Sequence, residues 1–296
     1  MRFGGRRTSS NVENRRGASG GFGFPMGGGG LRLGGGKMGC GGLVVIIVIA
    51  LIFGVNPMQL LGPTDGTPTT APHERRQGVT TGAAALDTET DRFISQVLAS
   101  TEDQWGRLFQ QAGQTYQPTR LVLYDRTDRS GCGIAQAAMG PFYCPAGQEI
   151  YIDTAFFNEL SQRLGAPGDF AQAYVIAHEV GHHIQTLDGT ADRVRSAQAR
   201  ASEAEGNALQ VRMELQADCY AGVWASTERA ALEPGDIEEG LTAAAAIGDD
   251  TLQKANQGYV VPESFTHGTS EQRMQWLQRG LKSGDPAQCD TFEGAL

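Results

Sequence analysis

The sequence predicts an α+β fold that is mostly helical, with a small sheet and an N-terminal transmembrane helix. In the folded part, short alternating segments typical of strands come first and long apolar-periodic segments typical of helices follow. No strand–helix–strand unit repeats, which argues against a large parallel sheet. An uninterrupted apolar stretch, residues 43–55, precedes both kinds of segment. At 296 residues the chain is long enough for one substantial domain plus appendages.

Composition divides the chain into four regions. Residues 1–40 are rich in Gly and Arg and have few aliphatic side chains, so we expect a disordered arm. Residues 41–61 supply the roughly 20 mostly apolar residues that a transmembrane helix needs. Residues 62–85, rich in Pro, Thr and Gly, are expected to form a linker. Residues 86–296 form the predicted folded domain.

The charge of the chain is unevenly distributed. Residues 1–42 carry a net charge of +6 and residues 43–296 one of −15. Basic residues before the apolar segment predict a single-pass protein of the cell membrane, with a cytoplasmic N-terminus and an extracytoplasmic domain. A cleaved signal peptide is the alternative, although no small-residue cleavage pattern follows the segment directly. The acidic domain argues against nucleic acid as a partner, and the Gly/Arg arm has few aromatic residues for stacking on RNA.

Periodicity predicts the elements of the domain in order. Residues 87–112 show the apolar spacing of a helix, and residues 121–125 are typical of a strand. Gly and Pro between residues 132 and 145 indicate a bent hairpin, and residues 148–153 alternate as a half-buried strand. The helices predicted next, separated by Gly and Pro, cover residues 155–164, 168–187, 190–230, 236–256 and 269–283.

Four of the five cysteines lie in the predicted domain, and Cys40 lies beside the apolar segment. In an oxidising compartment four cysteines predict two disulfides with three connectivities. We prefer Cys132–Cys144 with Cys219–Cys289, because the first pair brackets the predicted hairpin. A zinc–cysteine site is the alternative, but no CxxC spacing occurs.

The segment at residues 173–185, AYVIAHEVGHHIQ, contains the pattern HExxH in a predicted helix. His178 and His182 are four residues apart and project from one face, so both can bind one Zn²⁺ at about 2.0 to 2.1 Å. Glu179 can take a proton from a zinc-bound water and pass it to the leaving amine. A chance match is the alternative, but these groups are costly to bury without a metal. His183 points elsewhere, and we expect it to be structural.

A catalytic zinc site requires a third protein ligand, and ELQAD supplies a candidate on another predicted helix. Glu214 would complete a His, His, Glu site. Asp218, four residues on, is placed to accept a hydrogen bond from the far nitrogen of a ligating histidine, His178 in our interpretation. Two carboxylates four apart are common on solvated helices, but here their neighbours are largely apolar.

The segment SFTHGTSEQR, residues 264–273, places His267 on a loop before a helix capped by Thr269 or Ser270. His267 could donate a hydrogen bond to the oxyanion of a hydrolysis reaction, with Arg273 positioning it or the substrate. The alternative is a surface histidine followed by a surface arginine, which spacing alone does not exclude.

At these residues the chain resembles the bacterial family of predicted neutral zinc metallopeptidases, which implies a membrane-anchored peptidase of zincin type. More distantly the site is similar to that of gluzincins. That similarity implies Glu214 as third ligand, Asp218 as partner of a ligand, and His267 with Arg273 as the pair that acts on the transition state. The matching blocks are NVENRRG (11–17), GLVV (42–45), FGVNP (53–57), GPFYCP (140–145), HEVGHHIQ (178–185), ELQADCYAG (214–222) and THGTSEQR (266–273).

The resemblance also implies where a substrate binds. In zincins the strand before the metal helix borders the cleft, so residues 148–153 are expected to pair with an extended substrate. Residues 140–145 are expected to line the same cleft, stiffened by the Cys132–Cys144 disulfide.

The sequence therefore predicts a zincin-like domain over residues 86–296 that uses Zn²⁺ to hydrolyse peptide bonds, with Glu179 as general base. Its partners would be protein or peptide substrates and the membrane, although the same chemistry serves other amides such as cell-wall crosslinks. The main alternative is a zinc-stabilised binding or assembly module at the membrane without peptidase activity, against which an intact Glu179 argues. The sequence predicts no oligomeric state.

Overall fold

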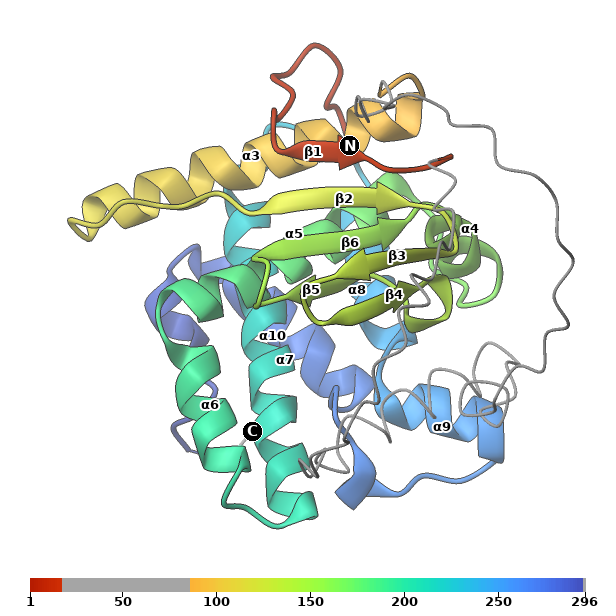
Figure 1. The fold of residues 1–296 in the computed structure, drawn as a ribbon, viewed down its shortest axis with the longest axis vertical. Helices are drawn as coiled ribbons and strands as arrows, with labels where there is room; N and C mark the ends of the chain where they lie inside the picture. Colours follow the sequence, from red (N-terminus) through yellow and green to blue (C-terminus); the bar gives the residue numbers. More distant parts are fainter. Residues whose placement is uncertain (18–85, 295–296) are drawn as a thin grey trace, which may run out of the picture.

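The computed structural model describes residues 1–17 and 86–294, in which a four-stranded sheet is packed against a group of helices (Figure 1). The strand order is β1–β2–β6–β5; β1 and β2 are parallel, as are β2 and β6, and β5 runs antiparallel to β6. A separate antiparallel hairpin consists of β3 and β4. The strands are β1 (Val12–Asn14), β2 (Arg120–Tyr124), β3 (Thr127–Ser130), β4 (Gly133–Gln136), β5 (Phe142–Cys144) and β6 (Glu149–Asp153).

The central strand β2 is buried on both faces, which explains its continuous apolar run. Because side chains alternate along a strand, Leu121 and Leu123 join the main core with the helices. Val122 and Tyr124 face the other way and form a smaller cluster with Ala135 of the β3–β4 hairpin. The hairpin thus covers one face of the sheet and the helices cover the other.

The helical part begins and ends largely as predicted, but two predicted helices are wrong as single helices. Residues 190–230 break at Ser202, whose hydroxyl caps a new helix in a capping box with Glu205. Residues 236–256 break at Gly248, where an added Cβ would overlap Ser270. The helices are α3 (Glu89–Gln111), α4 (Ala155–Gln162), α5 (Asp169–Leu187), α6 (Thr190–Gln198), α7 (Glu203–Thr227), α8 (Asp236–Ala246), α9 (Asp249–Gln257) and α10 (Ser270–Ser283). Short 3-10 turns are η1 (Ala137–Met139), η2 (Pro262–Ser264) and η3 (Pro286–Cys289).

Glycines allow α5, α7 and α10 to pack closely. A Cβ built on Gly181 of α5 would lie 2.9 Å from the Cα of Ala217 in α7. Where α7 crosses α10, Gly280 packs against the backbone of Cys219, and a side chain there would overlap it. These contacts bring the HExxH helix and the ELQAD helix together, as the zinc hypothesis requires.

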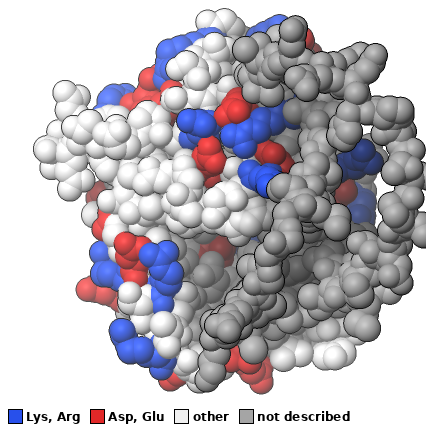
Figure 2. All heavy atoms as spheres, viewed as in Figure 1, with Lys and Arg blue, Asp and Glu red and all other residues white. Residues whose placement is uncertain are grey.

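The N-terminal segment, residues 1–17, packs on the domain, so the predicted disorder of residues 1–40 is wrong over this part. β1 extends the sheet next to β2, and Phe3 is buried in the main core. Composition missed this because the segment is held mainly by polar contacts rather than by apolar area. Basic and acidic side chains lie side by side on the face shown in Figure 2. Arg15 forms ion pairs with Glu13 and with Asp128.

Two charge contacts, each with one buried partner, fix the ends of this segment. The Met1 ammonium group lies 2.6 Å from Asp169 at the start of α5. Arg16 lies 2.6 Å from Asp91, which is 1% exposed in the first turn of α3. The folded body therefore includes residues 1–17 in addition to the domain predicted from residue 86 onward.

The transmembrane helix in the predicted fold class is not supported and is corrected here. Among residues 1–17 and 86–294, no helix is long and apolar enough to cross a membrane. The predicted span, residues 41–61, and the predicted linker, residues 62–85, lie outside the described residues. A single crossing would separate residues 1–17 from the domain by a bilayer, which is incompatible with the pairing of β1 and β2.

Both predicted disulfides are present. Cys132–Cys144 joins the β3–β4 turn to β5, and Cys219–Cys289 joins α7 to η3. The preferred connectivity is thereby confirmed.

Candidate metal centre

Three predicted ligands converge between α5 and α7. The candidate ligand atoms of His178, His182 and Glu214 all lie within 4.8 Å of one another. Glu214 Oε2 lies 3.2 Å from His178 Nε2 and 3.5 Å from His182 Nε2. The two imidazoles stand edge to face, at an interplanar angle of 89°. Two ring nitrogens and one carboxylate oxygen thus surround one small space, which is the donor set of a catalytic zinc site.

The far nitrogen of each histidine already has a partner. His178 Nδ1 lies 2.8 Å from Asp218 Oδ1, and His182 Nδ1 lies 2.9 Å from Gln185 Oε1. With both Nδ1 atoms donating, both Nε2 atoms carry lone pairs toward Glu214, an arrangement that repels unless a cation lies between them. The residues present therefore fit a bound metal ion.

The electrostatics of the three groups point to the same conclusion. Burial lowers the pKa of His178, but the carboxylates of Asp218 and Glu214 raise it to about 9. Burial raises the pKa of Glu214, yet His182 and His178 hold it well below its usual value. The cluster thus attracts positive charge, and a divalent metal can supply it in place of protons.

Glu179 lies next to His178 on α5 and is 7% exposed. Burial raises the pKa of its carboxyl group, while the neighbouring histidines oppose that rise. A carboxylate with a raised pKa beside a metal position is a better proton acceptor than a solvated one.

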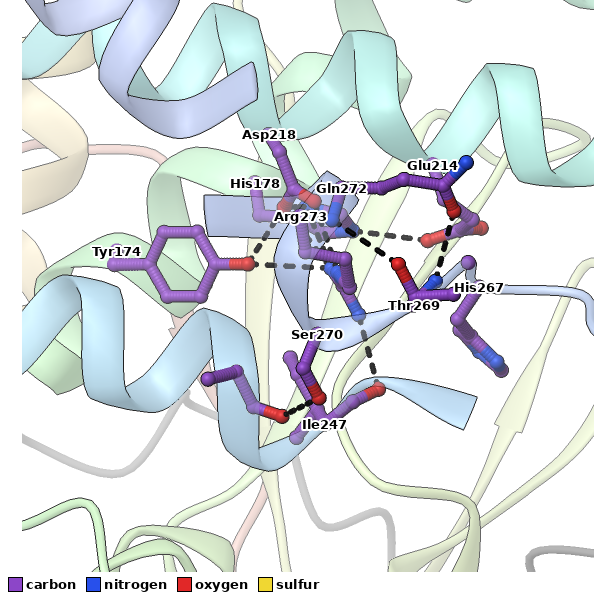
Figure 3. A network of polar contacts seen from close by, with 12 residues as sticks. Tyr174, His178, Glu214, Asp218, Ile247, His267, Thr269, Ser270, Gln272 and Arg273 are labelled. Carbon is purple, nitrogen blue, oxygen red and sulfur yellow. Dashed lines mark hydrogen bonds and ion pairs between the residues drawn. The ribbon is translucent and has the colours of Figure 1, made fainter. Parts of the chain in front are cut away.

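Asp218 is the centre of a buried polar network (Figure 3). Its Oδ1 accepts hydrogen bonds from Tyr174 Oη at 2.5 Å and Arg273 Nη2 at 2.9 Å, in addition to His178 Nδ1. Its Oδ2 accepts one from Arg273 Nε at 2.8 Å. Arg273 also donates to the carbonyl of Ile247. Asp218 thus has the predicted contact with His178.

The same network places Arg273 differently from the prediction. Its side chain is 1% exposed, so it offers no surface to a substrate or an oxyanion. The guanidinium holds Asp218, and through Asp218 it orients His178. We therefore describe Arg273 as a positioning residue and correct its assignment as a catalytic group.

His267 lies on the loop before α10 and keeps 32% of its side chain exposed. Asp249, at the start of α9, fixes this loop: its Oδ2 accepts the backbone N–H groups of Thr266, His267 and Gly268. Its Oδ1 lies 3.2 Å from His267 Nδ1. Burial lowers the pKa of His267, but Asp249 and Glu214 raise it above its usual value. Thr269 is the cap of α10.

His183 has the structural role that was predicted. Its Nε2 donates to the Gln117 carbonyl at 2.6 Å, so its Nδ1 accepts the hydroxyl of Tyr143 at 3.0 Å. Burial lowers its pKa, which keeps the ring neutral. These bonds tie β5 to the metal helix α5.

A second acidic cluster, Asp169, Asp236 and Glu239, also has metal-ligand spacing. Two of its members hold the Met1 ammonium group, and Glu239 accepts the backbone N–H of Phe170. These contacts account for the cluster without a metal.

Comparison with known proteins agrees with this geometry. A family model described as "Putative neutral zinc metallopeptidase" matches residues 1–292. The chain belongs to this family. "Uncharacterized protein YpfJ" of Escherichia coli (strain K12) is 52% identical over 296 residues, covering 99% of both chains. "Uncharacterized protein Rv2575" of Mycobacterium tuberculosis (strain H37Rv) is 41% identical over 261 residues, covering 83% of this chain and 86% of the relative. No solved structure matches the chain significantly.

In a zinc metallopeptidase the strand beside the metal helix is the expected place for substrate to pair. We expected residues 148–153 to pair with substrate, but this strand, β6, lies between β2 and β5 and is paired on both sides. The edge strand next to β6 is β5, from the GPFYCP block, and β1 forms the opposite edge. The substrate-pairing role assigned to β6 is therefore wrong.

Three residues of the site were missed from the sequence. Tyr174 lies four positions before His178, so helical spacing would have found it. Asp249 and Gln185 carry no motif of their own, and they act through contacts that only the folded chain creates. Gln185 is the last residue of the HEVGHHIQ block, so the family resemblance could have identified it as part of the site.

Proposed function

We propose that this member of the family is a zinc-dependent endopeptidase. The convergence of His178 Nε2, His182 Nε2 and Glu214 Oε2, with Glu179 adjoining on α5, carries the proposal. A purely structural zinc site would have four protein ligands and would not need a neighbouring carboxylate base. Three ligands leave a coordination position for a reacting group.

Each residue then has a distinct part in hydrolysis. A zinc ion bound to the three ligands supplies Lewis acidity toward water and toward the scissile carbonyl. Glu179 accepts the proton of the attacking water and returns it to the leaving amine. His267, whose pKa Asp249 and Glu214 raise against the effect of burial, donates a hydrogen bond to the carbonyl oxygen as that oxygen gains negative charge. Arg273 keeps Asp218, and thus a zinc ligand, in place.

We further propose that an extended peptide substrate pairs with the edge of β5 that no other strand of residues 1–17 and 86–294 occupies. A strand at the edge of a sheet presents unpaired backbone groups, and addition of a peptide strand satisfies them. Tyr143 links β5 to α5 through His183, and Cys144 links it to the hairpin. Both contacts support a rigid wall beside the metal helix.

The two disulfides support a working location in an oxidising compartment. Cys144, Cys219 and Cys289 are fully buried in their bonds, so the folded state has these bonds built into its core. Disulfides of this kind persist outside the reducing cytosol.

The experiment that tests the proposed function measures zinc content and peptide cleavage in parallel on the purified full chain. Wild type, His182→Ala and Glu179→Gln are compared, with Glu203→Gln, an exposed carboxylate at the start of α7, as control. We expect one zinc per chain in wild type, Glu179→Gln and the control, and loss of zinc in His182→Ala.

Cleavage of a denatured-protein panel should occur only in wild type and the control. Zinc bound without any cleavage in wild type would instead favour a zinc-stabilised binding module. Absence of zinc from wild type would overturn the metal site itself.

A further inference from the structure

A chain of side-chain amides leads from the metal ligand His182 to the C-terminal turn η3. His182 Nδ1 lies 2.9 Å from Gln185 Oε1, and Gln185 Nε2 donates to the Met213 carbonyl at 2.8 Å and to Gln216 Oε1 at 3.0 Å. Gln216 Nε2 in turn donates to the Cys289 carbonyl at 3.1 Å. Gln185 is 0% and Gln216 6% exposed, so water cannot readily replace these bonds.

The backbone ends of this chain set its direction. A carbonyl oxygen only accepts hydrogen bonds, so the amide nitrogens must face Met213 and Cys289. Both N–H groups of Gln185 are then committed, and its oxygen must face His182. An amide oxygen also only accepts, which places the proton of His182 on Nδ1. The lone pair is left on Nε2, the atom that lies 3.5 Å from Glu214.

The two zinc ligands are therefore oriented by different chemistry. His178 donates to a carboxylate that is held by an arginine, whereas His182 donates to a neutral amide. A carboxylate at position 185 could still accept from His182. It could not donate to Met213 or Gln216, so three acceptors would face one another in a buried space. Glutamine fits this position because one end accepts and the other donates.

The far end of the chain is held covalently. Cys289, whose carbonyl accepts the last bond, is joined by a disulfide to Cys219, which neighbours Asp218 on α7. Gln216 lies on the same helix, one turn before Tyr220. The disulfide thus fixes η3 against the helix that also supplies Glu214.

We propose that Gln185 and Gln216 form a positioning relay that fixes the tautomer and ring orientation of His182, anchored at η3 by the Cys219–Cys289 disulfide. This inference rests on the proposed zinc site and adds to it a dependence of zinc affinity on the C-terminal turn. Groups that hold a ligating histidine from behind typically contribute about 10-fold to 100-fold to metal affinity.

The test measures zinc affinity of the full chain by competition with a chromophoric chelator. Met has nearly the shape of Gln without its hydrogen bonds, so Gln185→Met and Gln216→Met remove the relay at little cost in volume. Gln96→Met is the matched control, because Gln96 is 6% exposed and donates to the Arg6 carbonyl, which belongs to the N-terminal segment and not to the candidate metal centre. We expect roughly 10-fold to 100-fold weaker zinc binding in Gln185→Met, a smaller loss in Gln216→Met, and wild-type affinity in Gln96→Met.

Coupling between the two glutamines distinguishes a relay from two separate supports. If they act in series, Gln185→Met with Gln216→Met should bind zinc no more weakly than Gln185→Met alone. Independent, multiplying losses would overturn the relay, as would a Gln185→Met affinity within about twofold of wild type, a threshold set well below the usual contribution of such groups. Wild type that binds no zinc would overturn the proposed metal site instead, so the two failures are distinguishable.

Two further measurements do not depend on activity. Nitrogen-15 NMR of metal-free protein, recorded at a pH high enough for the His182 ring to be neutral, should show the Nδ1–H tautomer in wild type and in Gln96→Met, and a tautomer mixture in Gln185→Met. The paired change Cys219→Ala with Cys289→Ala should weaken zinc binding in the wild-type background and leave it unchanged in Gln185→Met. An equal loss in both backgrounds would show that the disulfide acts independently of the relay.

Discussion

Replacement of Arg273 by Met should destabilise the metal-free protein more than any surface change on α10. Arg273 is 1% and Asp218 0% exposed, and two hydrogen bonds of 2.8 and 2.9 Å join them. Removing one member of such a pair leaves the other charge buried, which costs about 3 to 5 kcal/mol. For a protein of this size that corresponds to a fall in Tm of about 6 to 20 °C.

The assay is urea unfolding followed by circular dichroism, with EDTA present so that zinc binding does not add to the stability. Arg279→Met on the exposed side of α10 is the control and should change the free energy of unfolding by about 1 kcal/mol or less, through loss of its exposed contact with the Trp276 ring. The variant that carries both Asp218→Asn and Arg273→Met removes both charges, so it should be more stable than Arg273→Met alone.

Two results would refute this reasoning. If Arg273→Met is as stable as Arg279→Met, the guanidinium does not compensate the buried carboxylate. If the double variant is at least as unstable as the sum of its single changes, Asp218 and Arg273 do not act as a pair.

Three further outcomes are expected. Asp249→Asn should lower the pKa of His267, because one carboxylate fewer then opposes the effect of burial. Activity that needs the charged ring should decline at a lower pH than in wild type, with zinc content unchanged. An unshifted pH–rate profile would contradict this. Burial raises the pKa of Asp91, but the larger combined effect of Arg16 and the Thr88 cap brings it below its usual value. The contact with Arg16 should therefore stabilise the fold above about pH 4 and lose its effect as pH falls through the lowered pKa. As pH is lowered, the urea midpoint should fall less steeply in Arg16→Met than in wild type. Removal of zinc by a chelator should lower Tm. Added zinc should raise Tm again, in proportion to the logarithm of the zinc concentration. A Tm independent of zinc would mean that the folded state does not bind zinc.

Local spacing predicted which side chains converge, because helix geometry alone brings His178 and His182 to one face. Glu214 and Asp218 followed from the same rule applied to a second helix. The prediction was poorer wherever a role depends on what lies across the fold. Arg273 was predicted to position a substrate or His267, because its place on a helix does not reveal that its guanidinium is buried and bound to Asp218.

The sheet shows the same limit. The alternation of residues 148–153 identified a strand, but it could not tell a central strand from an edge strand, and the strand at the edge is β5. Residues 12–14 gave no strand signal, because β1 is three residues long and is stabilised by pairing with β2 and by ion pairs of its neighbours. Strand pairing between distant segments cannot be derived from composition.

The pairing of β1 with β2 gives the first 17 residues the character of a ligand carried on the same chain. β1 can bind only after β2 has been synthesised, so the start of the chain must wait for residues 120–124 before it can fold. Afterwards its attachment through the intervening chain keeps its effective concentration high, which lets a three-residue strand stay bound. A protease that cut anywhere between residues 17 and 86 would turn this intramolecular contact into a bimolecular one, and the sheet would then be open at β2 to any strand that could replace it.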